Sequence, residues 1–476
     1  MTTLLEDIQA PAGSGRPITD PATGEEIGRT PTATVDDLDK AIAAARAAQP
    51  GWTALGDATR VELMNKAADA IEQYAEELAV LLSREQGKPL NGPNARFEVG
   101  ACVAWLRAAT VPDVSPQIVI DDGETRAEVH YQPLGVVGAI GPWNWPMMIA
   151  IWQIAPNLRM GNTIVVKPSE FTPLSVLGLV HVLNTALPDG VLIAVAGGRD
   201  VGEAMAAHTG IDKIMFTGSI PTGQAIIRSS ADTVKRVTME LGGNDAGIVL
   251  DDADPAEIAQ KLFWGAFINT GQTCAALKRL YVPDGLYDAV CDELTEVARA
   301  VPMGVGLSEE NLLGPVQNRK QYDIVSSLVE DARTSGARIL VGGDPDPDAA
   351  GNFYPTTLVA DIDNDNPLVA KEQFGPALPI IRYTNLEQAI EWANGLDVGL
   401  GASVWSSSPK RARDVALRLH AGTVWVNEHG TIDPRVPFGG AKGSGYGVEF
   451  GREGLLECAQ AVSVKGPAGS FTEEES

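Results

Sequence analysis

The sequence VVGAI at Val136–Ile140 opens the part of the chain that decides the fold. Three further short apolar runs follow it, at Thr163–Val166 (TIVV), Leu192–Val195 (LIAV) and Lys213–Phe216 (KIMF). Helix-like stretches alternate with these runs, at Pro146–Leu158, Thr172–Leu187, Val201–Ala207 and Pro221–Ser230. Short strands rich in β-branched residues that alternate with helices are typical of βαβ units. We therefore expect an α/β fold built on a parallel sheet.

The same alternation resumes further along the chain. A glycine pair in Leu241–Asn244 interrupts the pattern, which places a domain boundary there. Six apolar runs follow, at Ala246–Leu250, Leu280–Val282, Ile339–Val341, Pro379–Tyr383, Ala402–Trp405 and Val424–Val426. A chain of 476 residues with 44% hydrophobic residues is long enough for two or three domains. A second α/β domain fits this half.

The part before the first apolar run is predicted to be helical. Asp36 is expected to cap a helix through Ala41–Ala48, and Asp57 to cap another that extends to Gly87.

A small β element is predicted next to these domains. Ile118–Ile120, the turn Asp121–Gly123 and Ala127–Tyr131 indicate a β-hairpin. Near the other end, Ala461–Val464 indicates an edge strand. We expect this strand to dock either on the hairpin or on a partner chain.

Charge and cysteine content exclude several classes of function. The net charge of −26 repels phosphate backbones and anionic lipids, so neither nucleic acid nor a membrane is an expected partner. The uncharged run Tyr131–Leu158 contains Pro142 and Pro146, and it fits a strand, loop and helix better than a membrane span. With five histidines and no cysteines spaced as metal pairs, no metal site is expected. Four cysteines and no apolar run in Met1–Pro17 favour a cytoplasmic protein without a signal peptide.

Three residues are candidates for catalysis. Cys274 follows a glycine-containing loop, whereas Cys102, Cys291 and Cys458 have apolar surroundings; a cysteine alone is nevertheless more often a buried hydrophobe than a nucleophile. Glu240 ends a predicted strand, where a carboxylate is either a general base or a partly buried or surface charge. Asn144, between two tryptophans, could donate to an oxyanion or satisfy a loop carbonyl.

Two segments are candidates for binding a nucleotide. Gly218 and Ser219 lie where a strand meets a helix, which suits a phosphate, although a simple tight turn is about as well supported. Lys167 and Glu170 end another strand and could address ribose hydroxyls, whereas solvated loop charges are the simpler interpretation.

The order of seven motifs along the chain decides between the functional and the simpler interpretations of these residues. The chain contains Pro142–Pro146 (PWNWP), Lys167–Glu170 (KPSE), Phe216–Ser219 (FTGS), Glu240–Gly243 (ELGG), Gly271–Cys274 (GQTC), Glu372–Pro376 (EQFGP) and Pro437–Gly440 (PFGG), in this order. This run resembles the aldehyde dehydrogenase superfamily over almost the whole chain. The resemblance implies a Rossmann-like NAD-binding domain (1–116 and 134–241), a second α/β catalytic domain (242–440) and a small β oligomerisation element (117–133 and 455–468).

The resemblance also assigns roles to individual residues. Cys274 would be the nucleophile, Glu240 the general base and Asn144 an oxyanion donor. The cofactor would be NAD, with NADP possible, and its binding residues would be Trp143, Lys167, Glu170, Gly202, Gly218, Ser219, Leu241, Glu372 and Phe374. The substrate tunnel would be lined by Trp145, Ile149, Trp152, Thr273, Ala275, Ile432 and Phe438. This lining is apolar and aromatic, and Arg435 is the nearest candidate cation, so we expect an uncharged aliphatic or aromatic aldehyde.

Two departures from the family pattern stand out. Many relatives have lysine where this chain has Asn244, and a glutamate common in the terminal segment aligns with Ala461, which puts a proton relay from Glu240 in doubt. Two other functions compete with hydrolytic oxidation: acyl transfer to CoA, and a catalytically silent dinucleotide-binding or structural homologue. The Cys274, Glu240 and Asn144 set argues against both. The resemblance further implies a homodimer or homotetramer.

Overall fold

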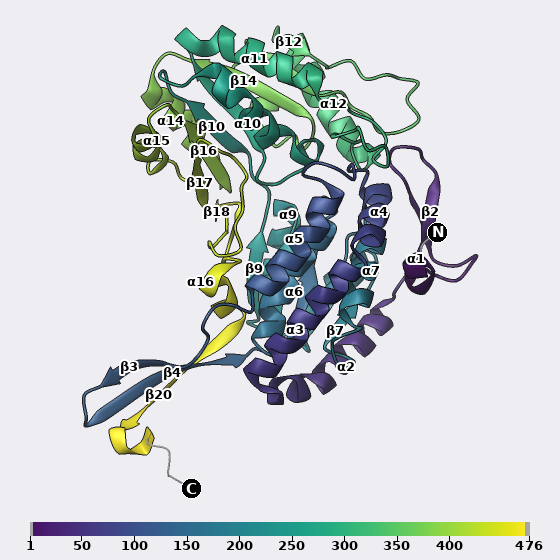
Figure 1. Cartoon of the computed structure of the whole chain (residues 1–476), viewed down its shortest axis with the longest axis vertical. Helices are drawn as coiled ribbons and strands as arrows, with labels where there is room; N and C mark the ends of the chain where they lie inside the picture. Colours follow the sequence, from purple (N-terminus) through teal and green to yellow (C-terminus); the bar gives the residue numbers. More distant parts are fainter. Residues whose placement is uncertain (1–2, 472–476) are drawn as a thin grey trace.

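The computed structural model describes residues 3–471, which form an α/β protein with two large sheets. The six-stranded sheet has the order β19-β9-β8-β5-β6-β7 (Figure 1). Its strands are β5 (Val136–Ile140), β6 (Thr163–Lys167), β7 (Leu192–Ala194), β8 (Lys213–Thr217), β9 (Arg236–Glu240) and β19 (Gly445–Tyr446). All neighbours pair in parallel except β19, which is antiparallel to β9. The four strands predicted around Val136–Phe216 are thus confirmed.

Helices cover both faces of this sheet, as a buried parallel sheet requires. The helices that connect its strands are α6 (Pro146–Arg159), α7 (Pro173–Leu183), α8 (Arg199–Ala207) and α9 (Ile220–Ala231). The earlier ones are α2 (Val35–Ala54), α3 (Gly56–Gln73), α4 (Ala75–Gln86) and α5 (Ala95–Ala108). One face packs against α3 to α7, the other against α2, α8 and α9. Before them lie α1 (Thr3–Ile8), β1 (Arg16–Thr19) and β2 (Glu26–Thr30).

Both predicted helix caps are wrong, and the single helix predicted from Asp57 to Gly87 is two helices, α3 and α4, with Tyr74 between them. The α2 cap is Thr34, whose side chain accepts from the Asp37 N–H while Asp37 bonds back, so a capping box formed by Thr34 replaces the expected Asp36 cap. Asp57 lies inside the first turn of α3, because α2 and α3 are separated only by Leu55. Gly87 ends α4 with φ +93°, where a Cβ would collide with Pro21 and Pro315.

The seven-stranded sheet has the order β12-β13-β14-β11-β10-β16-β17. Its strands are β10 (Asp245–Val249), β11 (Leu277–Pro283), β12 (Arg338–Val341), β13 (Thr357–Ala360), β14 (Ala377–Tyr383), β16 (Gly401–Trp405) and β17 (Thr423–Val426). All pairs are parallel except β12 with β13. Each of the six predicted runs coincides with a strand, except that Leu250 follows the end of β10; β13 was not predicted. The chain passes from one large sheet to the other between Glu240 and Asp245.

This second sheet is also covered on both faces. One face packs against α10 (Pro255–Phe267) and α11 (Tyr287–Ala300). The other packs against α12 (Arg319–Thr334), α13 (Pro367–Ala370), α14 (Leu386–Asn394) and α15 (Pro409–Ala416). A short antiparallel pair of strands, β15 (Val398–Gly399) and β18 (Ala441–Lys442), lies outside the two large sheets.

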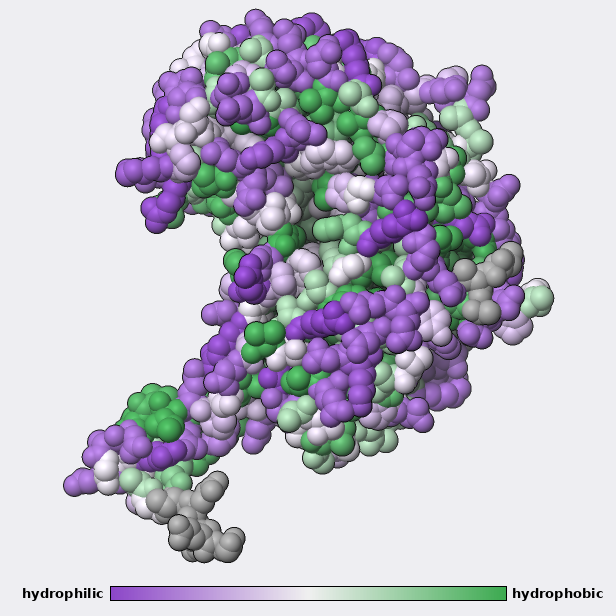
Figure 2. All heavy atoms as spheres, viewed as in Figure 1, coloured by the Kyte–Doolittle hydropathy of each residue, from purple (hydrophilic) through white to green (hydrophobic). Residues whose placement is uncertain are grey.

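The small β element projects from the body of the molecule (Figure 1). It contains β3 (Gln117–Asp121), β4 (Thr125–Pro133) and β20 (Ala459–Pro467), in the order β20-β4-β3, with α16 (Gly451–Leu456) leading into it. The predicted hairpin is confirmed, and the late strand docks on that hairpin within the same chain. Ile118, Val119 and Ile120 of the edge strand β3 are exposed, and Figure 2 shows hydrophobic surface on this projection.

Three of the four cysteines belong to the interior. Cys102, Cys291 and Cys458 are buried, as predicted, and Cys274 is partly exposed. Across residues 3–471, no helix has the length and apolar character that crossing a membrane demands. The uncharged run Tyr131–Leu158 forms the end of β4, all of β5, a loop and most of α6.

Candidate active site

Cys274 lies where the two large sheets meet. It follows α10 and a short 3₁₀ turn, Ile268–Gly271, and it precedes β11 of the seven-stranded sheet. Glu240 ends β9 of the six-stranded sheet, and the linker after it passes beside Cys274: a Cβ on Gly243 would come within 3.2 Å of the Cys274 carbonyl oxygen. Glu240 thus lies at the carboxyl end of a parallel strand, where α/β proteins bind ligands, and Cys274 lies just before the amino end of β11.

The loop before Cys274 is strained. Asn269, Thr270 and Gly271 all have positive φ, at 50°, 58° and 73°. A side chain on Gly271 would collide with the Gly375 carbonyl, and the Thr270 hydroxyl exchanges hydrogen bonds with Gly314 (3.0 and 3.1 Å). Backbone held in this region costs energy that the surroundings must offset. The packing around this turn therefore fixes the position of the thiol.

The Cys274 thiol is hard to ionise in this setting. Burial raises its pKa to about 12, and the carboxylates of Glu240, Asp245 and Glu372 add to the rise, whereas Lys278 lowers it. Because the thiolate is the reactive form, the positive charge of Lys278 offsets part of the cost of ionisation.

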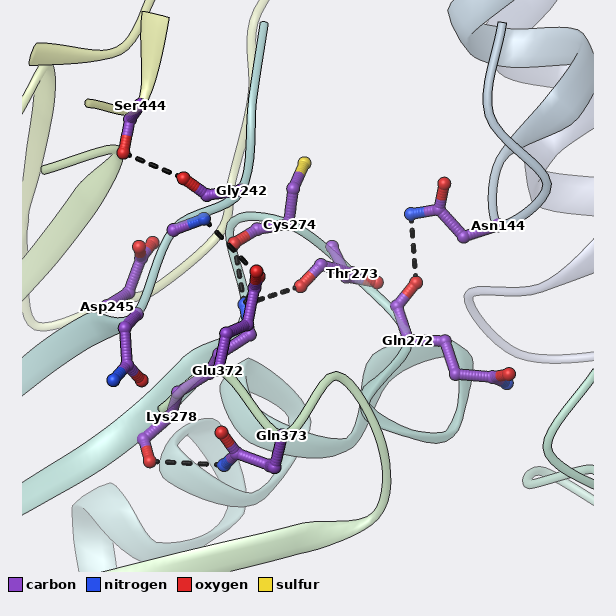
Figure 3. A network of polar contacts seen from close by, with 12 residues as sticks. Asn144, Gly242, Asp245, Gln272, Thr273, Cys274, Lys278, Glu372, Gln373 and Ser444 are labelled. Carbon is purple, nitrogen blue, oxygen red and sulfur yellow. Dashed lines mark hydrogen bonds and ion pairs between the residues drawn. The ribbon is translucent and has the colours of Figure 1, made fainter. Parts of the chain in front are cut away.

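Lys278 contacts both the cysteine loop and Glu372 (Figure 3). Its Nζ donates to the carbonyls of Cys274 (2.6 Å) and Thr273 (2.8 Å), and it forms an ion pair with Glu372 at 3.3 Å. Burial raises the pKa of Glu372, an effect that Lys278 and the Gly243 N–H reduce. Figure 3 shows the Cys274 sulfur directed away from Lys278, on the side of Asn144.

Asn144 is held rigidly opposite the cysteine loop. Its side-chain amide donates one N–H to the Gln272 carbonyl (2.9 Å), and its own backbone carbonyl accepts from Asn269 (2.8 Å) and Lys88 (2.9 Å). An amide nitrogen carries two N–H groups, so one remains for a ligand. The adjacent Trp145 indole N–H donates to the Thr273 hydroxyl at 2.9 Å.

A buried ion pair lies behind Asn144. Lys88 and Glu98 are completely buried and lie 2.6 Å apart, and Glu98 also accepts from the N–H groups of Met147 and Met148 at the start of α6. This pair fixes the loop from beneath. Neither residue was predicted; Glu98 stands between Phe97 and Val99, whereas the glycine and proline beside Lys88 give no such signal.

Glu240 has a second buried carboxylate beside it. Burial raises its pKa well above the usual value, and the charge of Glu449 raises it further. The Gly440 N–H offsets part of this shift, although neither carboxylate oxygen has a hydrogen bond of good geometry within residues 3–471. Burial likewise raises the pKa of Glu449 to about 8. Glu449 was missed; its signal was a lone carboxylate between Val448 and Phe450 after a glycine-rich run.

The two residues that depart from the family pattern lie in different settings. Ala461 is exposed on β20 of the projecting sheet and is paired with Tyr131. Asn244 is buried; its amide donates to the Val369 carbonyl (2.9 Å) and its backbone carbonyl accepts from Arg279 (2.8 Å). This residue therefore packs the linker between the two sheets.

Two predicted cofactor residues, Lys167 and Gly202, line one cavity. A cavity of about 400 Å³ is bounded by Ile140, Lys167, Gly202 and the start of α9, including Pro221 and Thr222. Ser219 is the N-cap residue of α9, and its hydroxyl bonds to the Thr222 hydroxyl (2.9 Å), which leaves its side chain off the helix N–H groups. Burial lowers the pKa of Lys167, while Glu170 and Asp200 raise it.

Glu170 lines a neighbouring cavity of about 90 Å³ with Ser169, Gly198 and Arg16. The Arg16 guanidinium donates to the Glu170 backbone carbonyl. Because a Cβ on Gly198 would lie 3.1 Å from Glu170 Oε1, a glycine there keeps the carboxylate accessible. Glu170 thus lies next to Lys167 but outside the larger cavity.

The remaining predicted cofactor residues lie on the Cys274 side. Trp143 and Phe374 form an edge-to-face pair with ring centroids 5.4 Å apart, and Phe374 is two residues from Glu372. Leu241 is buried, and its N–H donates to the Ser444 carbonyl.

The predicted tunnel residues belong to one apolar cluster. Trp145, Ile149, Trp152, Ala275 and Phe438 are buried in it, and Ile432 and Cys274 pack against it. Trp152 also contacts Phe450 edge-to-face at 4.8 Å, a residue that the sequence analysis missed. The candidate cation Arg435 is exposed and forms an ion pair with Asp433, whose pKa its guanidinium lowers to about 2.

Comparisons with known proteins identify the family of this chain. Residues 9–464 match the family described as the aldehyde dehydrogenase family. The chain is 37% identical to a betaine aldehyde dehydrogenase of Cereibacter sphaeroides over 462 residues (97% of this chain, 95% of the relative) and 37% identical to an aldehyde dehydrogenase of Fusarium over 446 residues (94% of each). The NAD⁺ complex of a Bacillus cereus aldehyde dehydrogenase superposes with a TM-score of 0.92 at 35% identity, covering 97% of this chain and 94% of that one. The chain belongs to the aldehyde dehydrogenase family.

Proposed function

We propose that this enzyme oxidises an uncharged aldehyde to the carboxylic acid, with NAD as hydride acceptor and Cys274 as nucleophile. The observation that carries the proposal is the convergence of Cys274, Asn144 and Glu240 from separate elements at the junction of the two sheets. The charge of Glu240 raises the pKa of the Cys274 thiol, so the two groups are close enough to interact electrostatically.

The first half of the reaction uses Cys274 and Asn144. The thiolate attacks the aldehyde carbon and forms a C–S bond, and the carbonyl oxygen becomes an oxyanion. The free Asn144 N–H and the Cys274 backbone N–H would stabilise this charge. Bound NAD⁺ supplies the hydride acceptor. Loss of hydride from the adduct leaves an acyl thioester on Cys274.

The second half uses Glu240. Its carboxylate removes a proton from water, the hydroxide attacks the thioester carbon, and the C–S bond breaks to give the acid and the thiolate. The raised pKa suits this role, because a base with a pKa nearer the working pH accepts a proton more readily. Sulfur serves both steps because it attacks well and leaves well.

The site offers groups that fit the cofactor. The 400 Å³ cavity beside the start of α9 would take the adenosine half, with Lys167, Glu170 and Gly202 at the ribose and adenine and Gly218–Ser219 at the pyrophosphate. Glu372 would accept from the hydroxyls of the nicotinamide ribose, and Phe374, Trp143 and Leu241 would pack around the ring.

The apolar cluster around Cys274 supports an uncharged substrate. Trp145, Trp152 and Phe438 would surround an aliphatic or aromatic chain, and Arg435 is occupied by Asp433 at the surface. Assays across aliphatic, aromatic, semialdehyde and amino-aldehyde substrates test this. A kcat/KM highest for a carboxylate-bearing semialdehyde would contradict it.

The wider organisation completes the proposal. Segments 1–116 and 134–241 would form the NAD-binding domain and 242–440 the catalytic domain. The projecting sheet, 117–133 with 455–468, would join copies into a homodimer or homotetramer, because β3 presents exposed Ile118, Val119 and Ile120 along an unpaired edge. We expect the enzyme to work in the cytoplasm.

Replacing Glu240 by glutamine separates hydrolysis from its competitors. Glutamine keeps the size of glutamate but accepts no proton, so Glu240→Gln should release NADH in the first turnover and then retain the acyl group on Cys274. Intact-protein mass spectrometry after mixing with aldehyde and NAD should show the added mass, and Cys274→Ala should show neither NADH nor acyl group. Acyl-CoA formation by the wild type would identify a CoA-acylating enzyme, and no NADH at all would identify a silent homologue.

A further inference from the structure

Lys278 is a buried lysine whose three contacts belong to two different parts of the site. Its side chain is 2% exposed. It donates to the carbonyls of Thr273 and Cys274 and forms an ion pair with Glu372, so each proton of the ammonium has an oxygen within reach. The loop that carries the nucleophile is thereby tied to the segment Glu372–Phe374.

This arrangement differs from that of two other buried lysines, Lys235 and Lys88. Lys235 donates only to the carbonyls of Ala206 and His208, at the end of β9 remote from Glu240, and Lys88 pairs with Glu98. Both hold backbone in place. Lys278 instead brings a positive charge among Glu240, Asp245 and Glu372, all of which act on Cys274.

The charge balance around Cys274 requires such a cation. Asp245 is buried, and neither of its carboxylate oxygens has a hydrogen bond within residues 3–471. Asp245 raises the pKa of both Cys274 and Glu372, and Lys278 lowers both. Without Lys278, ionising Cys274 would add another negative charge to an already negative buried site.

We propose that Lys278 is a positioning residue that links the nucleophile Cys274 to Glu372, the residue that would bind the cofactor. It holds the Cys274 carbonyl and Glu372 together, and its charge favours both the thiolate and the Glu372 carboxylate. This inference rests on the proposed function, because it takes Glu372 as the ribose-binding group. The effect on the thiol is independent of turnover.

Thiol alkylation without cofactor tests the first half of the inference. Because the Cys274 pKa lies above a usable assay range, the alkylation rate at fixed pH 8.5 is proportional to the thiolate fraction. Loss of a neighbouring positive charge shifts a pKa by about one unit or more, so Lys278→Gln and Lys278→Met should both react about tenfold more slowly with iodoacetamide. Peptide mass spectrometry identifies modification at Cys274. Lys235→Met is the matched control and should react at the wild-type rate.

Cofactor kinetics test the second half. Lys278→Gln should raise the KM for NAD several-fold, because an unpaired Glu372 takes up a proton more readily and loses acceptor capacity. In a Glu372→Gln background the same substitution should leave the KM unchanged, since the pathway through Glu372 is already absent.

The outcomes distinguish a failure of the proposed function from a failure of the role proposed for Lys278. A wild-type protein without NAD-dependent aldehyde oxidation would defeat the proposed function, and the alkylation rates would still decide the role of Lys278 at the thiol. An alkylation rate equal to that of the wild type in both Lys278 variants would overturn the inference. A slower rate in Lys278→Met alone would also overturn it, because it would indicate a purely structural role. If Lys278→Gln raised the KM for NAD equally with and without Glu372→Gln, the proposed link from Lys278 to cofactor binding would be wrong.

Discussion

Glu449 lies close enough to Glu240 for its charge to raise the pKa of the Glu240 carboxyl, and both groups are buried at the junction of the two sheets. Two carboxylates that share a low-dielectric site resist double ionisation. If Glu240 takes a proton from water as proposed, a second carboxylate lies close to that proton. We therefore expect both carboxylates to set the pH dependence of thioester hydrolysis.

Removing the charge of Glu449 should shift the pH profile toward acid. In Glu449→Gln the neighbouring negative charge is gone, so the pKa of Glu240 falls and its basic form persists to lower pH. The acid limb of the kcat profile should move down by about one pH unit. Glu453→Gln, an exposed residue of α16, is the control and should leave the limb in place. A limb that stays fixed or moves upward would contradict the coupling.

Asn144→Ala tests the oxyanion donor. Losing one such donor usually lowers kcat by about a hundredfold or more, because the interaction exists only in the transition state. The KM for NAD should barely change. If NAD binding instead weakened tenfold while kcat held, Asn144 would be a cofactor ligand. Both values come from steady-state assays at saturating aldehyde.

Breaking the buried Lys88–Glu98 pair should destabilise the protein and disturb the Asn144 loop. Lys88→Met leaves Glu98 charged and buried, a change that typically costs about 3–5 kcal/mol. Urea denaturation followed by tryptophan fluorescence should show a clearly lower midpoint. Lys66→Met, which breaks the surface pair with Glu62, should leave the midpoint unchanged. Equal midpoints for the two variants would mean that the buried pair contributes little.

The alternation of strands and helices in residues 136–216 was predictable because apolar period and length report local structure directly. The hairpin and its partner strand were equally readable, as short alternating runs with a turn between them. The cap at Thr34 was not, because Asp36 and Asp37 satisfy the same composition rule and only backbone geometry chooses between caps.

The candidate site residues divide in the same manner. Cys274, Glu240 and Asn144 stand in motifs, so their types and neighbours made them candidates. Glu449 and Lys278 become important through residues distant in sequence, Glu240 and Glu372 respectively. A sequence pattern can single out such a charge, but it does not show which other charge lies beside it in the fold.

Glu170 should bias the enzyme toward NAD. A carboxylate placed at the adenosine ribose repels a 2′-phosphate, while the nearby Lys167 and Arg16 moderate that repulsion. We expect kcat/KM to be higher with NAD than with NADP, and the ratio to fall in Glu170→Gln. Initial rates with each cofactor measure this. Equal values in the wild type, or a preference for NADP, would defeat the assignment.

Charges on β3 should weaken the assembly. Ile118→Lys together with Ile120→Lys places two like charges where a second copy would pack. Size-exclusion chromatography with light scattering should show a smaller mass than for the wild type. Leu417→Lys changes the exposed leucine that directly follows α15 and should leave the mass unchanged. An unaltered mass in the β3 variant would place the interface elsewhere.

The pairing of β20 with β4 also affects the order in which the fold can form during synthesis. Pro133 of β4 pairs with Ala459 of β20, and β9 pairs with its edge strand β19 only once Gly445 has been made. The sheets that contain β4 and β9 therefore cannot be completed until residues 445–467 have been synthesised. Such late closure leaves strand edges unpaired on the nascent polypeptide, where a chaperone or a neighbouring nascent chain can engage them. Removal of residues 445–467 would therefore damage sheets whose other strands are made much earlier.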